Sequence, residues 1–275
     1  MASATLHRTP PLPTRVQVGL VALLLVLAGA AWALTGERMS GMDAGPGTAL
    51  GGLGWFTVVW VTMMAAMMLP SVTPMVVGHA RFQAAGRDGG TAPASVSGAF
   101  VAGYLVSWTA AGLLGYALFE GVRSLDIGFL AWDDAGQYVA GGVILGAALY
   151  KLTAPKDACL RHCRSPAMLL ERWRPGRAGA LRMGVEHGVA CVGCCWMLMA
   201  ALFALGVMSI ALMAFVAALI AAERLLPWKR PAVRTVAVVL AVLGLAVAFA
   251  PESVPGLTIP GSPEEMPAMT MGAVR

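Results

Sequence analysis

Long apolar runs separated by short charged or polar segments dominate this chain. Each run approaches the roughly 20 residues that a helix needs to cross the ~30 Å hydrocarbon core of a bilayer. The pattern predicts spans at residues 17–34, 55–78, 96–119, 136–152, 186–204, 207–224 and 233–250. The predicted fold class is therefore all-α, a polytopic membrane helix bundle with about seven transmembrane helices.

Residues 188–222 carry no charged side chain and are too long for one crossing. A break near Gly206 divides them into two closely joined helices. A single tilted or kinked helix is the alternative, and it would invert the orientation of every later segment.

Basic residues gather after alternate spans. They lie before the first span, after the second, after the fourth and after the sixth, whereas the intervening segments and the tail are mainly acidic. The positive-inside rule then indicates a cytoplasmic N terminus and an outward C terminus. With a single helix at 188–222, Lys229 and Arg230 would lie outside, so the charge pattern favours two helices.

This topology divides the chain into a cytoplasmic N-terminal segment (1–16), a transmembrane domain (17–250) with a basic cytoplasmic loop (153–185), and an outward methionine-containing tail (251–275). The first apolar run also imitates a signal peptide, because Arg15 precedes it and small residues close it. Cleavage within residues 1–33 is thus an alternative, and it would leave the later orientation unchanged.

Composition agrees with a membrane location. Hydrophobic residues make up 58% of the chain and charged residues 12%, with a mean hydropathy of +0.75. These values lie outside the range of soluble domains of this length. The net charge of +5 comes from basic segments between apolar runs rather than from one basic face. We expect membrane lipid as a partner and no nucleic acid.

The fifth predicted span begins with a group of soft metal ligands at helical spacing: His187, Cys191, Cys194, Cys195 and Met199. Intervals of three and four residues place them along one helical face. Three thiols and an imidazole can bind monovalent copper or zinc. A buried cysteine is otherwise an ordinary small apolar residue, but three within five residues after a histidine favour a metal site.

The second predicted span carries four methionines in two pairs one turn apart, Met63 with Met67 and Met64 with Met68. Pro70 and Pro74 remove backbone donors, so two carbonyls in this span need new partners, for which the Ser71 and Thr73 hydroxyls are close by. Methionine often serves only as a packing residue. A broken helix beside four thioethers nevertheless favours the wall of a metal site.

Two smaller groups flank these spans. The basic loop holds Cys159, His162 and Cys163, which share a face if this segment is helical, although inert thiols in a solvated loop are the alternative. Thioethers that resist oxidation are expected on the outer side, at Met39, Met42, Met266, Met269 and Met271, with chance placement as the alternative. His79, near the inner end of the second span, is expected at the surface.

Three motifs in order carry a resemblance to a known family: MMAAMMLPSVTP, LTAPKDACLRHCRSP, and MGVEHGVACVGCCWMLM followed by FALGVMS. They are similar to those of a bacterial family of predicted metal-binding integral membrane proteins, a domain of unknown function sometimes labelled copper chaperone. The resemblance covers about residues 55–228. It implies a copper-associated protein of the bacterial inner membrane, with metal ligands in the methionine span and the histidine–cysteine span.

The sequence thus favours a protein that binds monovalent copper, with zinc as the other metal, and imports it or hands it to a copper-delivering or copper-accepting protein. The methionines and the fifth-span cysteines are expected at similar depth on helices of opposite direction. No enzymatic activity is expected. A transmembrane thiol–disulfide relay is one alternative, and a structural or assembly factor whose sulfurs only pack is another.

Overall fold

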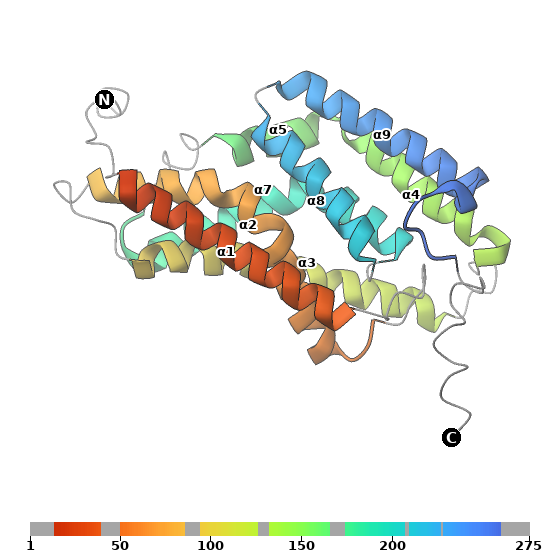
Figure 1. Ribbon diagram of the computed structural model, residues 1–275, viewed down its shortest axis with the longest axis horizontal. Helices are drawn as coiled ribbons and strands as arrows, with labels where there is room; N and C mark the ends of the chain where they lie inside the picture. The colour runs from red at the N-terminus through yellow and green to blue at the C-terminus, as the bar shows by residue number, and fades with distance from the viewer. Residues whose placement is uncertain are drawn as a thin grey trace.

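Helices form almost all of the chain that the computed structural model describes, namely residues 14–39, 50–85, 94–125, 132–165, 174–206, 209–226 and 228–259 (Figure 1). They are α1 (Thr14–Met39), α2 (Leu53–Ala85), α3 (Ala94–Ser124), the π-helical turn η4 (Trp132–Gly136), α4 (Gln137–Tyr150), α5 (Ala154–Arg164), α7 (Gly176–Leu205), α8 (Ile210–Leu225), α9 (Lys229–Phe249) and the 3-10 turn η5 (Pro251–Ser253). No strand occurs within these ranges, so the all-α class is confirmed there.

Several sequence predictions lie outside the described residues. The predicted N-terminal segment is described only from Thr14, and the basic loop is not described over 166–173. The outward methionines Met42, Met266, Met269 and Met271 also fall outside, whereas Met39 is buried at the end of α1.

Five of the described helices are long and apolar enough to cross a membrane: α1, α2, α3, α7 and α9. α4 is apolar but shorter, and α8 has 16 residues. The fold is therefore compatible with a multi-pass membrane protein. Seven crossings, and the sides on which the termini lie, stay predictions.

The long uncharged stretch forms two helices. α7 ends at Leu205, and Gly206 adopts a φ of 106°, which residues with a side chain rarely adopt. α8 then returns alongside α7, so that Arg224 near its end reaches Cys191. The break near Gly206 was predicted from run length and charge, and the structure shows it.

Most neighbouring helices run in opposite directions. Arg81 near the end of α2 bonds Gln17 near the start of α1, while Arg38 at the end of α1 lies over the Trp55 ring at the start of α2. α4 and α9 are also antiparallel, because Gly141 approaches Ala248 there. In Figure 1, α1 and α2 lie side by side, as do α4 and α9.

α3 and α7, by contrast, run parallel, and they share the most extensive helix packing among the described residues. A Cβ at Gly184 would overlap the carbonyl oxygen of Phe100, and a Cβ at Gly188 would lie 2.7 Å from Ser107 Cβ. Glycine permits this close backbone approach, as at other small-residue contacts between membrane helices. The contact holds Tyr104 of α3 against α7.

Residues 153–185 are not one continuous loop. α5 occupies much of this segment, and α7 begins at Gly176, well before the expected residue 186. Pro155 in the first turn, Asp157 near the N terminus and basic residues in the last turn all suit α5 and its dipole. The basic segment between the fourth and fifth predicted spans is therefore partly helical, as the sequence analysis allowed for Cys159, His162 and Cys163.

α2 is continuous through Pro70 and Pro74, so the predicted break in this helix was wrong. The two neighbouring hydroxyl groups donate to the carbonyls of Met68 and Leu69, at 2.9 and 2.8 Å, instead of to the carbonyls that the prolines free. The helix tolerates polar groups at this level without being interrupted.

Candidate metal centre

Four of the five cysteines form one buried group, here called the cysteine cluster: Cys163 of α5 with Cys191, Cys194 and Cys195 of α7. The Cys194 Sγ lies 3.3 Å from the Cys195 Sγ and 3.8 Å from the Cys163 Sγ. All five cysteines of the chain are free thiols. The two cysteine groups that were separate in the sequence therefore meet in space.

α5 supplies this connection because it is amphipathic and packs against α7. Cys163 and Leu160 are buried on its inner face, whereas Cys159 and His162 are half-buried. A Cβ at Gly193 would lie only 2.9 Å from the Cys159 Sγ, so this thiol also sits close to the α7 backbone. The predicted helical face of this group exists, and it points its thiols toward α7.

The guanidinium group of Arg224 lies among the sulfurs. Its Nη2 is 2.8 Å from the Cys191 Sγ, 3.1 Å from the Cys194 Sγ and 3.5 Å from the Cys195 Sγ. The side chain is buried. A neutral thiol is a weak acceptor, whereas a buried cation needs an anionic counter-charge. The geometry therefore favours a thiolate at one or more of these three cysteines.

More buried charges adjoin the cysteine cluster. The Glu223 Oε2 lies 2.8 Å from the Lys151 Nζ and 3.2 Å from the Lys156 Nζ, and all three side chains are buried. Burial lowers the pKa of Lys156, which the nearby Glu223 carboxylate opposes. When ionised, the three buried cations including Arg224 exceed the charge of Glu223 by two. Thiolates or a metal–thiolate complex would neutralise this excess.

His187 is a candidate ligand one turn before Cys191. Its side chain is fully buried, and neither ring nitrogen has a hydrogen-bond partner among the described residues. The Tyr104 ring lies 5.9 Å from the His187 ring, and the Tyr104 hydroxyl lies 3.0 Å from the Cys191 Sγ. Because an unsatisfied buried nitrogen is costly, metal ligation would remove a penalty at this position.

His79 is buried, so its expected place at the surface was wrong. α2 continues to Ala85, beyond the predicted end of the span, and the added turns carry His79 inside the packed bundle. Its ring lies 5.1 Å from the ring of Phe100, which in turn lies 6.0 Å from the ring of His187. Phe100 therefore lies near both buried histidines.

The predicted methionine ligands Met63, Met64, Met67, Met68 and Met199 are all buried. Two side-chain contacts align α2 with α7. The rings of Trp60 and Phe203 lie 5.5 Å apart, and Ser71 reaches Cys191 through the two terminal nitrogens of Arg224. The four α2 methionines lie between Trp60 and Ser71, hence at levels between Phe203 and Cys191 of α7.

The methionines and the cysteine cluster thus lie at similar depth on antiparallel helices, as the sequence suggested. The α2 backbone packs mainly against α1 and α3 rather than α7, so side chains make the α2–α7 connection. Metal ligation by the thioethers stays a prediction.

The cysteine cluster is not a closed metal site as it stands, since no group of three His, Cys, Asp or Glu side chains has converged on a metal position within the described ranges. Arg224 lies between the sulfurs instead. The 3.8 Å between the Cys163 and Cys194 sulfurs nevertheless matches a tetrahedral site, in which bonds of ~2.3 Å separate the sulfurs by about 3.8 Å. The 3.3 Å between the Cys194 and Cys195 sulfurs is shorter than this, so ligation of an ion requires movement of these side chains and of the guanidinium group.

Sequence analysis missed Arg224 and Tyr104. Arg224 was assigned to the charged flank of a span, yet apolar residues continue after it as Leu225 and Leu226. A charged pair inside an apolar run is the signal of a buried functional charge, and Glu223 with Arg224 presents it. A lone tyrosine within the third span offered no comparable signal.

The fold and the site define a class, a helical membrane-compatible protein with a buried group of soft metal ligands and counter-charges. The model of the PpoB2 family, described as copper chaperone, matches residues 57–247, and the chain belongs to this family. The match extends from α2 to α9 and includes every predicted metal ligand. No curated protein and no solved structure matches the chain. The family resemblance is confirmed, and the family description suggests copper binding.

Proposed function

We propose that this protein spans the bacterial inner membrane several times, binds monovalent copper at the cysteine cluster, and imports the ion or hands it to another protein. The observation that carries this proposal is the convergence of four buried thiols from α5 and α7 around Arg224. The copper chaperone family supports the choice of metal. The role is binding and transfer rather than catalysis.

Charge balance supports a thiolate-bound monovalent ion. Cu⁺ held by three thiolates carries a net charge of minus two, which offsets the excess of two positive charges from Lys151, Lys156, Arg224 and Glu223. A zinc ion reaches the same charge with all four thiols of the cysteine cluster as thiolates. The soft thioethers of α2 at the same depth are therefore the observation that favours copper.

Each group then has a role in the proposal. Cys191, Cys194 and Cys195 hold the ion, and Cys163 exchanges it between α7 and α5. His187 is a further ligand at the inner end of this face, and the α2 methionines with Met199 supply soft contacts toward the outer end. Cys159 and His162 on the half-buried side of α5 receive the ion for release.

Measurement of bound metal in the purified protein tests the proposal. We expect copper to bind in preference to zinc under competition, and the triple variant Cys191→Ser, Cys194→Ser, Cys195→Ser to lose at least ~100-fold in copper affinity, because serine oxygen is a poor ligand for soft ions. Met213→Leu is the matched control, since it alters a buried sulfur on α8. Unchanged copper content in the triple variant would overturn the proposal.

The second candidate function is the thiol–disulfide relay, which the 3.8 Å between the Cys163 and Cys194 sulfurs favours. These two thiols would pass two electrons and two protons to the disulfide of an acceptor and form a disulfide themselves. Alkylation of thiols in living cells followed by mass spectrometry separates the functions. The copper proposal expects both cysteines to be trapped as thiols, whereas a reversible disulfide between them would favour the relay.

A further inference from the structure

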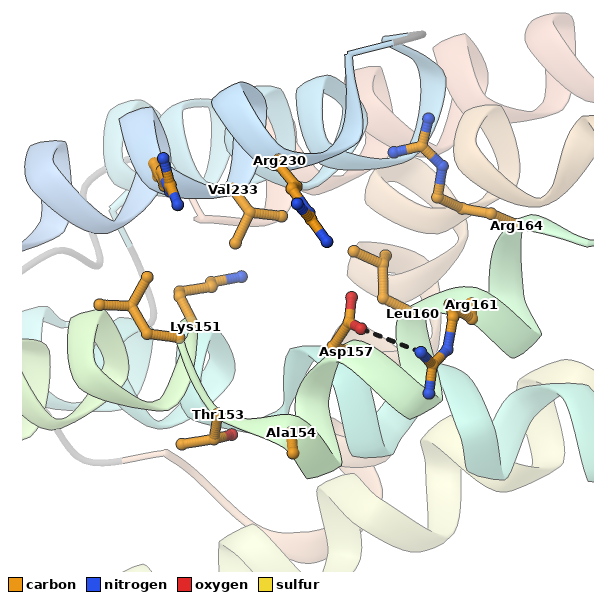
Figure 2. Close-up of a pocket in the computed structure, with 11 residues that line it drawn as sticks. Lys151, Thr153, Ala154, Asp157, Leu160, Arg161, Arg164, Arg230 and Val233 are labelled. Carbon is orange, nitrogen blue, oxygen red and sulfur yellow. Dashed lines mark ion pairs between the residues drawn. The ribbon is translucent and has the colours of Figure 1, made fainter.

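A basic cavity of ≈ 560 Å³ lies between the α4–α5 junction and the first turns of α9 (Figure 2). Its charged lining consists of Lys151, Asp157, Arg161, Arg164, Arg230 and Arg234. In Figure 2, Arg230 and Val233 extend from α9 toward the space that Asp157 and Leu160 of α5 face from the other side. Five cations and one carboxylate therefore share one hollow.

Three of these cations have partners inside the protein. Lys151 bonds Glu223, Arg161 pairs with Asp157 at 3.3 Å, and the Nη1 of Arg164 donates to the backbone carbonyl of Glu223 at 2.6 Å. Arg230 and Arg234 have no ion-pair or hydrogen-bond partner among the described residues. They lie one turn apart on α9, so their like charges repel. The cavity therefore holds positive charge that the protein does not neutralise.

The placement of this charge along α9 strengthens the argument. α9 begins at Lys229, has no acidic residue in its first turn, and has no side-chain cap at Trp228. Cations at a helix N terminus are unfavourable, because that end already carries partial positive charge. An anion in the cavity would offset both the repulsion between Arg230 and Arg234 and their unfavourable position at the N terminus of α9.

The cavity also lies at a predicted membrane boundary. The apolar span of α9 starts at Arg230, and α4 ends at Tyr150, just before the lining residue Lys151. Leu152 in the lining is 63% exposed, so an apolar surface adjoins the charges. Basic pockets between membrane helices on the cytoplasmic side suit the headgroups of anionic lipids.

We propose that this cavity binds a phosphate group, which Arg230 and Arg234 hold at the cytoplasmic boundary of the membrane, and that an anionic lipid headgroup or free phosphate supplies it. The proposal rests on the multi-pass membrane assignment but not on metal binding. Its ligand neutralises the arginines of α9 and ties this helix to α5.

Titration of the full-length protein in detergent tests this proposal. Phosphatidylglycerol is compared with phosphatidylcholine, and inorganic phosphate with chloride at equal ionic strength, while thermal unfolding and native mass spectrometry report binding. The variant Arg230→Gln/Arg234→Gln is compared with Arg15→Gln/Arg177→Gln, which removes two exposed arginines on the same predicted side. We expect the cavity variant to bind about 30-fold more weakly, since each arginine near an anionic surface contributes about 1 kcal/mol.

The arms identify the source of the phosphate. Binding of phosphatidylglycerol without binding of inorganic phosphate assigns a lipid headgroup, and binding of both assigns the phosphate group itself. Equal affinity of the cavity variant and the control variant, or no binding of either ligand, would overturn the proposal. Copper content is measured on the same samples. The cavity variant is expected to bind copper normally, so failure of the phosphate proposal can be distinguished from failure of the copper proposal.

Discussion

The α2 methionines and the cysteine cluster are both buried sulfur groups at similar depth, yet their surroundings differ. The Cys191 Sγ contacts a guanidinium group and a phenol hydroxyl, and a buried ionic group lies next to Arg224. Met63, Met64, Met67 and Met68 belong to the same hydrophobic core as the cysteines, but no hydrogen bond or ion pair joins their thioethers to another described residue. A thiol can ionise and then needs a counter-charge, whereas a thioether stays neutral at any pH. The two groups have similar composition, but only the cysteine cluster has charged side chains around it.

This difference predicts unequal contributions to metal binding. The cysteine cluster should supply most of the affinity, because thiolates and their counter-charges act together on the ion. The methionines should contribute contacts that are weaker and more easily replaced.

Among the single-residue changes at these two sulfur groups, removal of the Arg224 counter-charge is expected to lower copper affinity the most. Arg224→Leu should weaken copper affinity by about 10- to 100-fold, the range typical of groups that support metal ligands. Arg224→Lys should recover part of this loss, since it keeps the charge. Competition with a copper chelator measures the affinity, and Arg38→Leu, which changes an exposed arginine, is the control. A normal affinity in Arg224→Leu would mean that the charge around the thiols is irrelevant to binding.

Removal of the α5 thiol comes next. Cys163→Ser should weaken copper binding by about 10-fold, near the lower end of the expected range, because Cys191, Cys194 and Cys195 remain. Cys159→Ser, on the same helix but half-buried, should change the affinity less. The chelator competition assay measures both variants. Equal losses in the two would show that contact with Cys194 gives Cys163 no special role.

Replacement of the methionines should have a smaller effect. The quadruple variant Met63→Leu, Met64→Leu, Met67→Leu, Met68→Leu is expected to change copper affinity by less than about 3-fold, because leucine conserves much of the volume and the thiolates remain. Thermal unfolding of the metal-free protein checks that the bundle is intact. If the quadruple variant lost as much copper affinity as the triple serine variant, the methionines would contribute as much to binding as the cysteines, and the predicted difference would be wrong.

The smallest expected effect concerns the phenol hydroxyl beside the cysteine cluster. Tyr104→Phe should lower the free energy of unfolding by about 0.5–1.5 kcal/mol through loss of the hydrogen bond with Cys191. Tyr116→Phe removes a more exposed hydrogen bond, to the Gly51 carbonyl, and is the matched control. Denaturant titration in detergent compares the two. If Tyr116→Phe lowered the free energy of unfolding more than Tyr104→Phe, the buried hydrogen bond to Cys191 would have no special stabilising role.

The sequence predicted the helical parts of this comparison well, for clear physical reasons. Apolar run length and the placement of charge are local properties, so the long apolar helices and the break near Gly206 could be predicted from the sequence. The common face of Cys191, Cys194 and Cys195 follows from helical periodicity alone.

The assembled site depends on packing between distant segments. Sequence analysis could place Cys159 and Cys163 on one face of a helix, but docking of that helix against α7 is a tertiary contact. Arg224 was used only as a charge that indicates membrane orientation. Its burial depends on contacts with the thiols of another helix, which the sequence does not show. His79 and the continuity of α2 likewise depended on helix length and neighbours rather than on local pattern.

The glycine contact between α3 and α7 also determines where the site can open. Because Gly184 and Gly188 bring the α3 and α7 backbones into direct contact, these two helices form a rigid frame that fixes Cys191 against Tyr104. The remaining members, Cys163 and Arg224, belong to the shorter helices α5 and α8. Under the proposed function, we therefore expect an ion to enter or leave by displacement of α5 and α8 rather than of α3 and α7.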